Sequence, residues 1–306
     1  MKQRVTLAAE LYYLYHLTQN EIANQLGVSR VWVGKLLKTA EDLGFVRIEV
    51  NTLSAGVTEL ETVFTEKFSL KRAKVVRCTG NEPCLQTTAH AAANYLAGIL
   101  RHNDRLSTSW GATLAAIVTE LVPLYFPDII VTPFTGGFGY NPNVTPNQIA
   151  FSLAEKLSAK VAPLHAPGLM AGRQERDLLL LDPTIHRIIE ESENADILLM
   201  GVGALRNPTL TATRAISEKE LAELSDAGCV GEIGMNFIDG SGRLVDHPIQ
   251  SRLVSGNLKK ARQHAREVIV VGCGASKAEI LRASMTGRWV DSVVTDETAA
   301  RAVLNI

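Results

Sequence analysis

Apolar residues recur three and four positions apart through the N-terminal part of the chain, which is the repeat of amphipathic helices. The first such repeat covers residues 5–17. Thr18, followed by Glu21 three positions later, has the capping-box signature of a second helix that runs to Leu26. The pattern therefore predicts two consecutive short helices, the second with a defined start.

The next segment predicts a tight turn and a third helix. Gly27 can end the second helix in a left-handed conformation, and Ser29 can cap a helix over residues 30–43. Residues 45–50, FVRIEV, then alternate apolar and charged side chains, as the short strand of a winged variant would. Helical spacing resumes over residues 53–68 and predicts a helix that links this region to the rest of the chain.

From about residue 73 the pattern changes to short apolar runs that alternate with helical stretches. Such alternation predicts a doubly wound, mostly parallel α/β sheet that is covered on both faces. The expected strands are residues 73–77, 105–109, 129–134, 160–165, 196–201, 267–272 and 292–296, and the expected helices include residues 87–100, 112–122, 147–158, 217–226 and 275–286.

Length and composition agree with two domains of a soluble globular protein. The 306 residues are 46% hydrophobic and 21% charged, and their net charge is −1. We expect a DNA-binding domain at residues 1–52 and a larger domain at residues 53–306, with a linker helix over residues 53–70. No signal peptide or membrane-spanning run is recognisable, so we expect a cytoplasmic protein.

Cysteine and histidine usage gives no indication of a metal or cofactor. The four cysteines are scattered without a C-x-x-C pair, which suits reduced thiols in a cytoplasm. None of the seven histidines has metal-ligand spacing such as H-E-x-x-H. We therefore expect neither a metal site nor a cofactor. The cysteines are Cys78, Cys84, Cys229 and Cys273.

The second and third helices, with the glycine turn between them, match the DNA-binding helix-turn-helix, in which the second helix enters the major groove. Between Gly27 and Ala40 the chain carries three basic residues and no acidic one. Such cations release counterions from DNA phosphates. The alternative is a helical hairpin with a solvated basic face. The expected DNA contacts are Thr18, Gln19, Ser29, Arg30, Val31, Lys35 and Lys38.

Glycines and hydroxyls gather where the expected strands end, and ligands of parallel sheets bind beyond these carboxyl ends. The second strand runs into SWGAT (109–113) and directly into a helix, whose free amides would suit a phosphate. The third runs into TGG (135–137), and two others end in GVGA (201–204) and GCGASK (272–277). Simple strand–helix connections are the alternative. The set predicts a crevice around an anionic ligand.

The segment 231–245, GEIGMNFIDGSGRLV, adds two carboxylates to the candidate site. Asp239 opens a tight turn, DGSG, between two short strands, and turn chemistry alone can explain an aspartate there. Glu232 could hydrogen-bond sugar hydroxyls or could be a solvated carboxylate. Both alternatives stay open at this point.

Together these segments resemble the SorC family of bacterial sugar-responsive transcriptional regulators, which includes regulators called DeoR-type. The resemblance runs essentially from end to end. It rests on LTQNEIANQLGVSRVWVGKLL, SWGAT, the glycine pair after the third strand and GEIGMNFIDGSGRLV. Its most specific part is GCGASKAEILRASMTGRWVDSVVTDETA (272–299).

The resemblance implies an effector domain with the fold of sugar-phosphate isomerases but without their catalysis. It also implies a phosphorylated sugar as effector and homodimers or homotetramers on operator DNA. Some members carry a cation where this chain has Thr135, so the threonine favours a non-covalently held ligand with one phosphate. The implied ligand-binding residues are Ser109, Gly111, Ala112, Thr113, Thr135, Gly136, Gly137, Asn147, Gly203, Glu232, Asp239 and Lys277.

We therefore expect a regulator, by default a repressor, of a carbohydrate-utilisation operon, gated by this ligand. An active sugar-phosphate isomerase or lyase with an attached DNA-binding domain is the alternative, and Glu232 and Asp239 would be its acid and base. A third possibility is a domain that has lost its ligand and only oligomerises.

Overall fold

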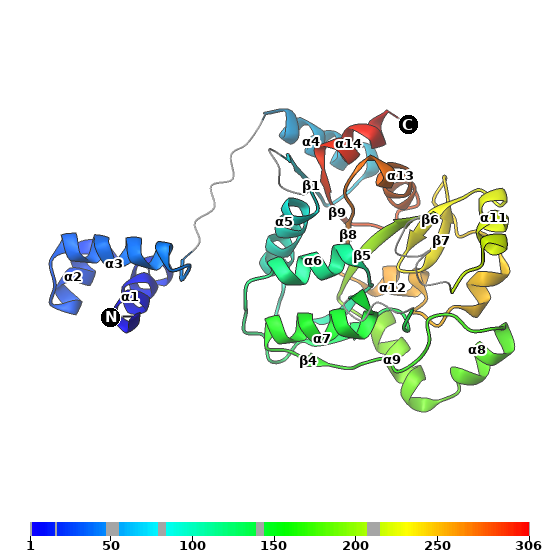
Figure 1. Cartoon of the computed structure of the whole chain (residues 1–306), viewed down its shortest axis with the longest axis horizontal. Helices are drawn as coiled ribbons and strands as arrows, with labels where there is room; N and C mark the ends of the chain where they lie inside the picture. The colour runs from blue at the N-terminus through cyan, green and yellow to red at the C-terminus, as the bar shows by residue number, and fades with distance from the viewer. Residues whose placement is uncertain are drawn as a thin grey trace. The chain divides into compact units, whose positions relative to one another are not determined.

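The computed structural model describes residues 2–15, 17–46, 55–78, 84–138, 144–206 and 215–305. Contacts between residues divide the chain into two compact units, Met1–Leu53 and Ser54–Ile306 (Figure 1). Each unit has a hydrophobic core of its own.

The first unit is helical. Its core is formed where α3 packs against both α1 and α2, and its buried side chains include Val5, Ile22, Val33 and Leu37. The predicted second and third helices are confirmed, while the first helix begins earlier than predicted and continues as a π-helical turn. The expected strand of the wing falls mainly on residues 47–50, outside the described residues. The elements are α1 (Lys2–Ala9), η1 (Glu10–Leu14), α2 (Gln19–Leu26) and α3 (Arg30–Asp42).

The turn between α2 and α3 has the predicted local chemistry. The Thr18 side chain accepts a hydrogen bond from the Glu21 amide at 3.3 Å, and the Glu21 carboxylate accepts one from the Thr18 amide at 2.8 Å. Gly27 follows α2 with φ +63°, in the left-handed region where a side chain is strained. Ser29 then accepts a hydrogen bond from the Trp32 amide at 3.2 Å. Both helix starts are therefore fixed by side chains.

The second unit is built on one sheet with strand order β1-β9-β8-β5-β2-β3-β4, in which all these neighbours are parallel. A hairpin of β6 and β7 joins it antiparallel to the end of β5. The strands are β1 (Arg72–Val76), β2 (Arg105–Thr108), β3 (Ile130–Pro133), β4 (Lys160–Val161), β5 (Ile197–Ala204), β6 (Cys229–Ile233), β7 (Asn236–Asp239), β8 (Glu267–Val271) and β9 (Ser292–Asp296).

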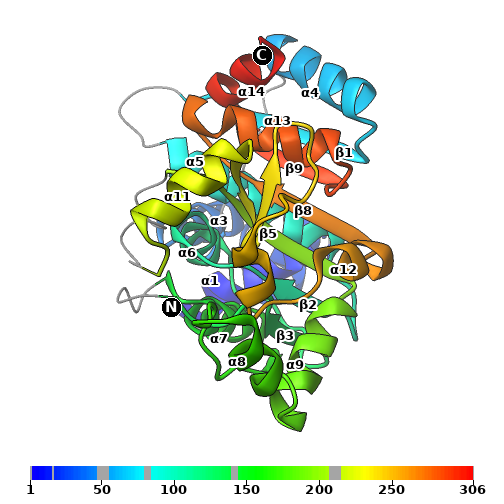
Figure 2. The same cartoon turned by 90° about the vertical axis from the view of Figure 1, so that its right-hand side faces the viewer.

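Helices cover both faces of this sheet, as predicted (Figure 2). One layer is α5 (Cys84–Ile99), α6 (Ala112–Glu120) and α7 (Pro146–Leu157). The other face carries α4 (Ala55–Phe68), α9 (Pro183–Glu193), α12 (Leu258–His264), α13 (Ala278–Thr286) and α14 (Glu297–Leu304). Outside these layers lie α8 (Arg173–Leu179), α11 (Glu218–Asp226), η3 (Pro248–Arg252) and η4 (Ala275–Lys277).

The helix predicted as a linker is part of this second core. Val57, Leu60 and Phe64 of α4 are buried in it, and Phe64 is fully buried. In Figure 1 α4 lies beside α14, which comes from the far end of the sequence, and residues of the two helices are in contact. No helix among the described residues has the length and apolar content needed to cross a bilayer.

One strand prediction differs from the structure. The fourth strand was expected over residues 160–165 but ends at Val161, since Pro163 has no amide hydrogen for a sheet. The predicted tight turn at Asp239–Gly242 is confirmed: the Gly242 amide donates to the Asp239 carbonyl at 2.9 Å, and Ile238 is bridged to Leu244. A second turn, at Gly234 and Met235, joins β6 to β7 and was not predicted; both residues have positive φ.

The capping boxes of the two units give a matched pair of substitutions. Thr18→Ala should destabilise α2, and Ser217→Ala should destabilise α11, each by about 1 kcal/mol, because each removes a side-chain acceptor from a helix start. Hydrogen exchange followed by mass spectrometry checks this. Faster exchange should stay within residues 19–26 for Thr18→Ala and within 218–226 for Ser217→Ala. Unchanged exchange in the altered helix would contradict the assignment.

Candidate functional site

The exposed face of α3 carries the cations predicted to contact DNA. Ser29 and Arg30 lie at its start and are exposed, and 71% of the Val31 side chain is accessible. Lys38 forms an exposed ion pair with Asp42 at 3.7 Å. Within the described ranges, Arg30 and Lys35 form no ion pair, so their charges face solvent.

The opposite face of α3 is held by the core. Val33, Leu36 and Leu37 are buried, so the helix presents the other side chains outward. Gly34 lies toward α2, and a side-chain carbon there would meet only the Gln19 Oε1 at 4.0 Å. Packing within the unit therefore does not require a glycine at this position. A close approach of DNA to this part of the helix would account for it.

The second candidate site lies at the carboxyl ends of the strands, beginning with SWGAT. The Ser109 Oγ is buried and accepts a hydrogen bond from the Gly201 amide at 2.9 Å, which ties β2 to β5. Gly111 has φ +105° and donates its amide hydrogen to the Val144 carbonyl at 3.2 Å. The amides of Ala112, Thr113 and Leu114 precede the first hydrogen bond of α6, from the Ala115 amide to the Gly111 carbonyl at 3.1 Å, and have no acceptor within the helix. The first two, at Ala112 and Thr113, are the candidate anion donors of this turn.

The TGG segment after β3 is hydrogen-bonded to other segments of the second unit. Thr135 is fully buried, and its hydroxyl donates to the Val254 carbonyl at 3.3 Å. The Gly136 amide also donates to Val254, at 2.9 Å, and the Gly137 amide donates to Ala166, at 2.8 Å. A side-chain carbon on Gly136 would lie 2.7 Å from the Ala166 carbonyl oxygen. These glycines allow two chain segments to approach closely.

Two other predicted residues bind backbone as well. Asn147 donates from Nδ2 to the Leu164 carbonyl at 3.0 Å and accepts the Leu164 amide at 2.9 Å. Asp239 lies in its own turn, where Oδ1 accepts the amides of Ser241 and Arg243, both at 2.9 Å. The structure therefore places Asp239 at the end of β7 opposite the β6–β7 turn, away from Glu232.

Glu232 and Lys277 are brought together at the end of β5. Glu232 is paired with Gly203 across β5 and β6, is 9% exposed, and accepts the Met235 amide at 2.7 Å. Burial raises the pKa of Glu232 to about 7, and the nearby Lys277 ammonium partly opposes this. Burial likewise lowers the pKa of Lys277. Burial opposes the charged forms of both the Lys277 amine and the Glu232 carboxyl group, which suits a polar ligand that can compensate for their lost hydration.

The loop that carries Lys277 depends on Asp296, a residue that the sequence analysis did not include in the site. Asp296 is 1% exposed, and its Oδ1 accepts the Gly274 amide at 2.7 Å and the Ala299 amide at 3.4 Å. Gly274 has φ +85° and opens the turn of residues 275–277. Asp296 is the N-cap of α14, a role that the sequence does indicate. Its hydrogen bond to the Gly274 amide is visible only in the fold.

An aromatic pair was also missed. The rings of Trp110 and Phe138 are stacked, with their centroids 5.3 Å apart, and they join the glycine-rich ends of β2 and β3. They pack against a buried cluster that includes Met235 and Phe237 of the hairpin. Aromatic surfaces beside polar groups are common in sugar-sized binding sites.

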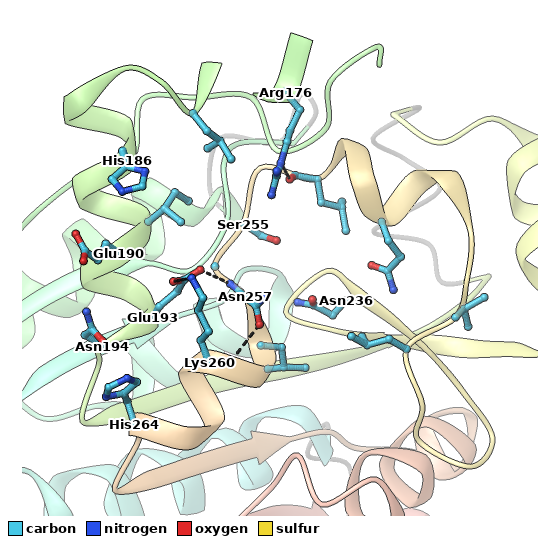
Figure 3. Close-up of a pocket in the computed structure, with 18 residues that line it drawn as sticks. Arg176, His186, Glu190, Glu193, Asn194, Asn236, Ser255, Asn257, Lys260 and His264 are labelled. Atoms are coloured by element: carbon cyan, nitrogen blue, oxygen red, sulfur yellow. Dashed lines mark hydrogen bonds and ion pairs between the residues drawn. The ribbon is translucent and has the colours of Figure 1, made fainter. Parts of the chain in front are cut away.

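A cavity of about 710 Å³ lies elsewhere, between α9, α12 and η3 (Figure 3). Asn236 and Ser255 point into it, and Lys260 and Glu193 form an ion pair at its edge, 3.4 Å apart. No predicted ligand residue lines it. It shares a wall with the candidate site, because Ser255 is bridged to Thr135.

The cysteines differ from the expectation of four free thiols. Cys78 and Cys84 form a disulfide, whereas Cys229 and Cys273 are free. Cys78, Cys84 and Asp296 are also the one group of potential metal ligands among the described residues. The sequence could not indicate this pair, because a C-x5-C spacing has no fixed geometry.

Comparisons with known proteins match transcriptional regulators along nearly the whole chain. Residues 54–305 match the family described as "Putative sugar-binding domain". The chain is 28% identical to the deoxyribonucleoside regulator of Bacillus subtilis (strain 168), over 99% of this chain and 98% of that protein. It is 27% identical to the sorbitol operon regulator of Klebsiella pneumoniae, over 97% and 96%. The crystal structure of full-length SorC from Klebsiella pneumoniae matches with a TM-score of 0.76 at 25% identity, over 99% and 98%.

A helix-turn-helix unit joined to an α/β unit with a polar strand edge defines a ligand-responsive transcriptional regulator, and the match to the full-length SorC structure extends over both units of this chain. The chain belongs to the sugar-binding domain family, among the regulators of the SorC/DeoR type.

The buried Glu232 gives a pH-dependent prediction. Its pKa is raised from an ordinary 4.5 to about 7, so between these values the unfolded chain ionises before the folded protein does. Rising pH should therefore cost stability over this window, up to about 3 kcal/mol, and no more above pH 7. Glu232→Gln has no carboxyl group to ionise and should not lose this stability. In urea unfolding, the free energy of unfolding of the variant minus that of wild type should rise from pH 5 to pH 7 and then level off.

Glu175→Gln is the matched control, because the Glu175 side chain is exposed. Its difference from wild type should stay flat across the same pH range. A flat difference for Glu232→Gln as well would mean that the carboxyl is not buried as described.

Proposed function

We propose that this protein is a DNA-binding regulator of a carbohydrate-utilisation operon, and that a phosphorylated sugar binding to its second unit controls it. The observation that carries the proposal is the pairing of two features in one chain. One is an exposed basic helix with a capped start. The other is a glycine-rich sheet edge, where the helix amides after β2 and the Lys277 ammonium after β8 lie at the carboxyl ends of strands on either side of β5.

The DNA contact is proposed for α3 and the start of α2. Arg30, Lys35 and Lys38 supply the phosphate contacts, and Ser29 and Val31 at the start of α3 reach base edges. Thr18 and Gln19 at the start of α2 contact the sugar-phosphate backbone of the DNA. The slightly acidic chain does not oppose this, because the attraction depends on the charge of the face that meets DNA.

The effector site is proposed at the ends of β2, β5 and β8. The amides of Ala112 and Thr113 and the Lys277 ammonium hold the phosphate, since a helix start favours an anion. Glu232 takes the sugar hydroxyls. Ser109, Gly111, Asn147 and the glycines at 136, 137 and 203 shape the site through their backbone contacts. The burial of Thr135 supports a ligand with a single phosphate, held without a covalent bond.

A non-enzymatic effector unit is proposed on geometric grounds. An isomerase needs an acid and a base on opposite sides of one reacting carbon. Glu232 is buried at one end of the β6–β7 hairpin, while Asp239 is bound in its own turn at the other end, roughly 10 Å away at 3.3 Å per residue. The two carboxylates therefore do not flank a common space.

Control by the ligand requires that it bind one arrangement of the protein better than another. We propose that the protein acts in the cytoplasm as a homodimer or homotetramer, in which ligand binding changes how two α3 helices fit an operator. Release of repression is the proposed direction of control.

Salt dependence tests the DNA contact. For the full chain on operator-containing DNA, log K should fall linearly with log salt, and each lost phosphate contact should reduce the slope by about 0.9. Arg30→Ala and Lys35→Ala should each show this reduction in a filter-binding titration. Lys38→Ala should change less, because Asp42 already pairs with Lys38.

The matched control for this series is Lys259→Ala, which removes the same charge from an exposed lysine of α12 in the second unit. Its slope should equal that of wild type. A wild-type slope near zero, or an equal reduction of the slope in Lys259→Ala, would contradict the proposal that α3 contacts DNA.

A panel of sugar phosphates tests the effector site by thermal unfolding. At one hundred times its Kd, the effector should stabilise the protein by about 2.7 kcal/mol and raise Tm by several degrees. The unphosphorylated sugar should give no comparable shift. Lys277→Met should abolish the shift, whereas Lys259→Met should keep it. If no compound stabilises the protein, a unit that only oligomerises becomes the better description.

A further inference from the structure

The Cys78–Cys84 disulfide lies beside the network that holds the Lys277 loop. Cys78 follows β1, Cys84 is the first residue of α5, and their Cα atoms are 5.4 Å apart. The cysteines are separated by six positions, so the bond closes a short loop and restricts the unfolded chain little. Its main effect is therefore local.

The Asp296 carboxylate faces this pair from the end of β9. Its Oδ2 lies 3.3 Å from the Cys84 sulfur, while its Oδ1 is already held by the Gly274 and Ala299 amides. A thiol can donate its hydrogen to Oδ2, but a disulfide sulfur has none to give. Among the described residues Oδ2 has no other hydrogen bond, and the side chain is 1% exposed. Within the described part of the chain, the disulfide therefore leaves Oδ2 without a donor, which the dithiol form would supply.

Small molecules can reach the pair. A cavity of about 500 Å³ is lined by Cys78, Ala275, Asp296 and Arg301. Cys78 thus borders the open space, while the sulfur of Cys84 lies against the carboxylate. This arrangement gives the two sulfurs different roles, because the accessible one meets a reagent first.

We propose that Cys78 and Cys84 form a reversible dithiol–disulfide site, oxidised by peroxides and reduced by thiols. The Cys78 thiolate attacks a peroxide oxygen, the O–O bond breaks, and a sulfenic acid forms as the departing oxygen leaves as hydroxide or alkoxide and takes up a proton. The Cys84 sulfur then attacks Cys78 and gives its proton to Asp296 Oδ2. The S–O bond breaks, and hydroxide takes that proton as water. The peroxide gains the two electrons that the sulfurs lose.

Oxidation of this site alters the effector site through Asp296. The same carboxylate holds Gly274, which opens the turn that carries Lys277, and Lys277 faces Glu232. Loss of the thiol hydrogen bond changes how strongly Asp296 holds the Gly274 amide. This second step rests on the proposed function. Linkage then requires that the anion change the disulfide equilibrium by the same factor by which oxidation changes anion affinity.

The test equilibrates the full chain in glutathione buffers of graded reduced-to-oxidised ratio, followed by acid quenching, alkylation and intact mass measurement. Four cysteines should be alkylated at the reducing end and two at the oxidising end, with peptide mapping to Cys78 and Cys84. The change should reverse completely. Asp296→Asn should favour the disulfide about tenfold, because a neutral amide can donate to sulfur and leaves no buried charge unpaired.

Glu297→Gln is the matched control, since it removes one negative charge from the adjacent residue, which contacts Arg77 and Arg301 rather than the sulfurs. Its equilibrium constant should match that of wild type. If Asp296→Asn does not fold, as judged by circular dichroism, the wild-type titration decides alone. A pair that never oxidises, a bond that resists excess dithiothreitol in the folded protein, or an unchanged constant in a folded Asp296→Asn would each overturn the proposal.

Two further measurements separate the redox site from a metal site and test its coupling to an anion. Reduced protein that retains one Zn²⁺ per chain through gel filtration and then fails to oxidise would show a metal site at Cys78, Cys84 and Asp296 instead, and would overturn the redox assignment. Inorganic phosphate is the probe for coupling, and it should shift the glutathione midpoint. A reversible disulfide with no effect of phosphate would support the redox site and overturn its coupling to the anion through Asp296, whereas the effector site itself is tested by the thermal unfolding panel.

Discussion

Parallel pairing of seven strands is the constraint from which the rest of the second unit follows. Because neighbouring strands point the same way, every connection must return along a face of the sheet, and helices cover both faces as a result. The same arrangement brings all carboxyl ends to one edge. Residues as far apart in sequence as Thr113, Glu232 and Lys277 reach that edge without any local signal that links them.

Much of this fold could be predicted from periodicity, and the errors have identifiable causes. Alternation of apolar runs and helical repeats located seven strands, the helices α5, α6 and α7 of one face, and α4 and α13 of the other. The segment 183–193 was not predicted, although Asp182 followed by Pro183 is a helix start that the structure uses. The turn between β6 and β7 was not predicted because Met235 adopts φ +68°, which the sequence gives no reason to expect. Packing of Met235 in the core holds that conformation.

The candidate site was less predictable, because ligand contact and close packing require the same residue types. Gly136 lacks a side chain so that another chain segment can lie against it, yet a glycine facing a phosphate would look identical in sequence. Asn147 similarly has both polar groups bound to Leu164. Conversely, Asp296 looked like a helix cap alone. Only the fold shows that its carboxylate also accepts the Gly274 amide and lies 3.3 Å from the Cys84 sulfur.

The pairing of β1 with β9 also affects how the chain reaches its folded state. These strands are separated by about 220 positions, and β1 has no other partner in the sheet. A ribosome must therefore synthesise nearly the whole effector unit before this edge can close, and an apolar strand waits unpaired meanwhile. Among the described residues, the core of the helix-turn-helix unit is formed by side chains between Val5 and Val46. These contacts can form once that stretch has emerged, long before the second unit is complete.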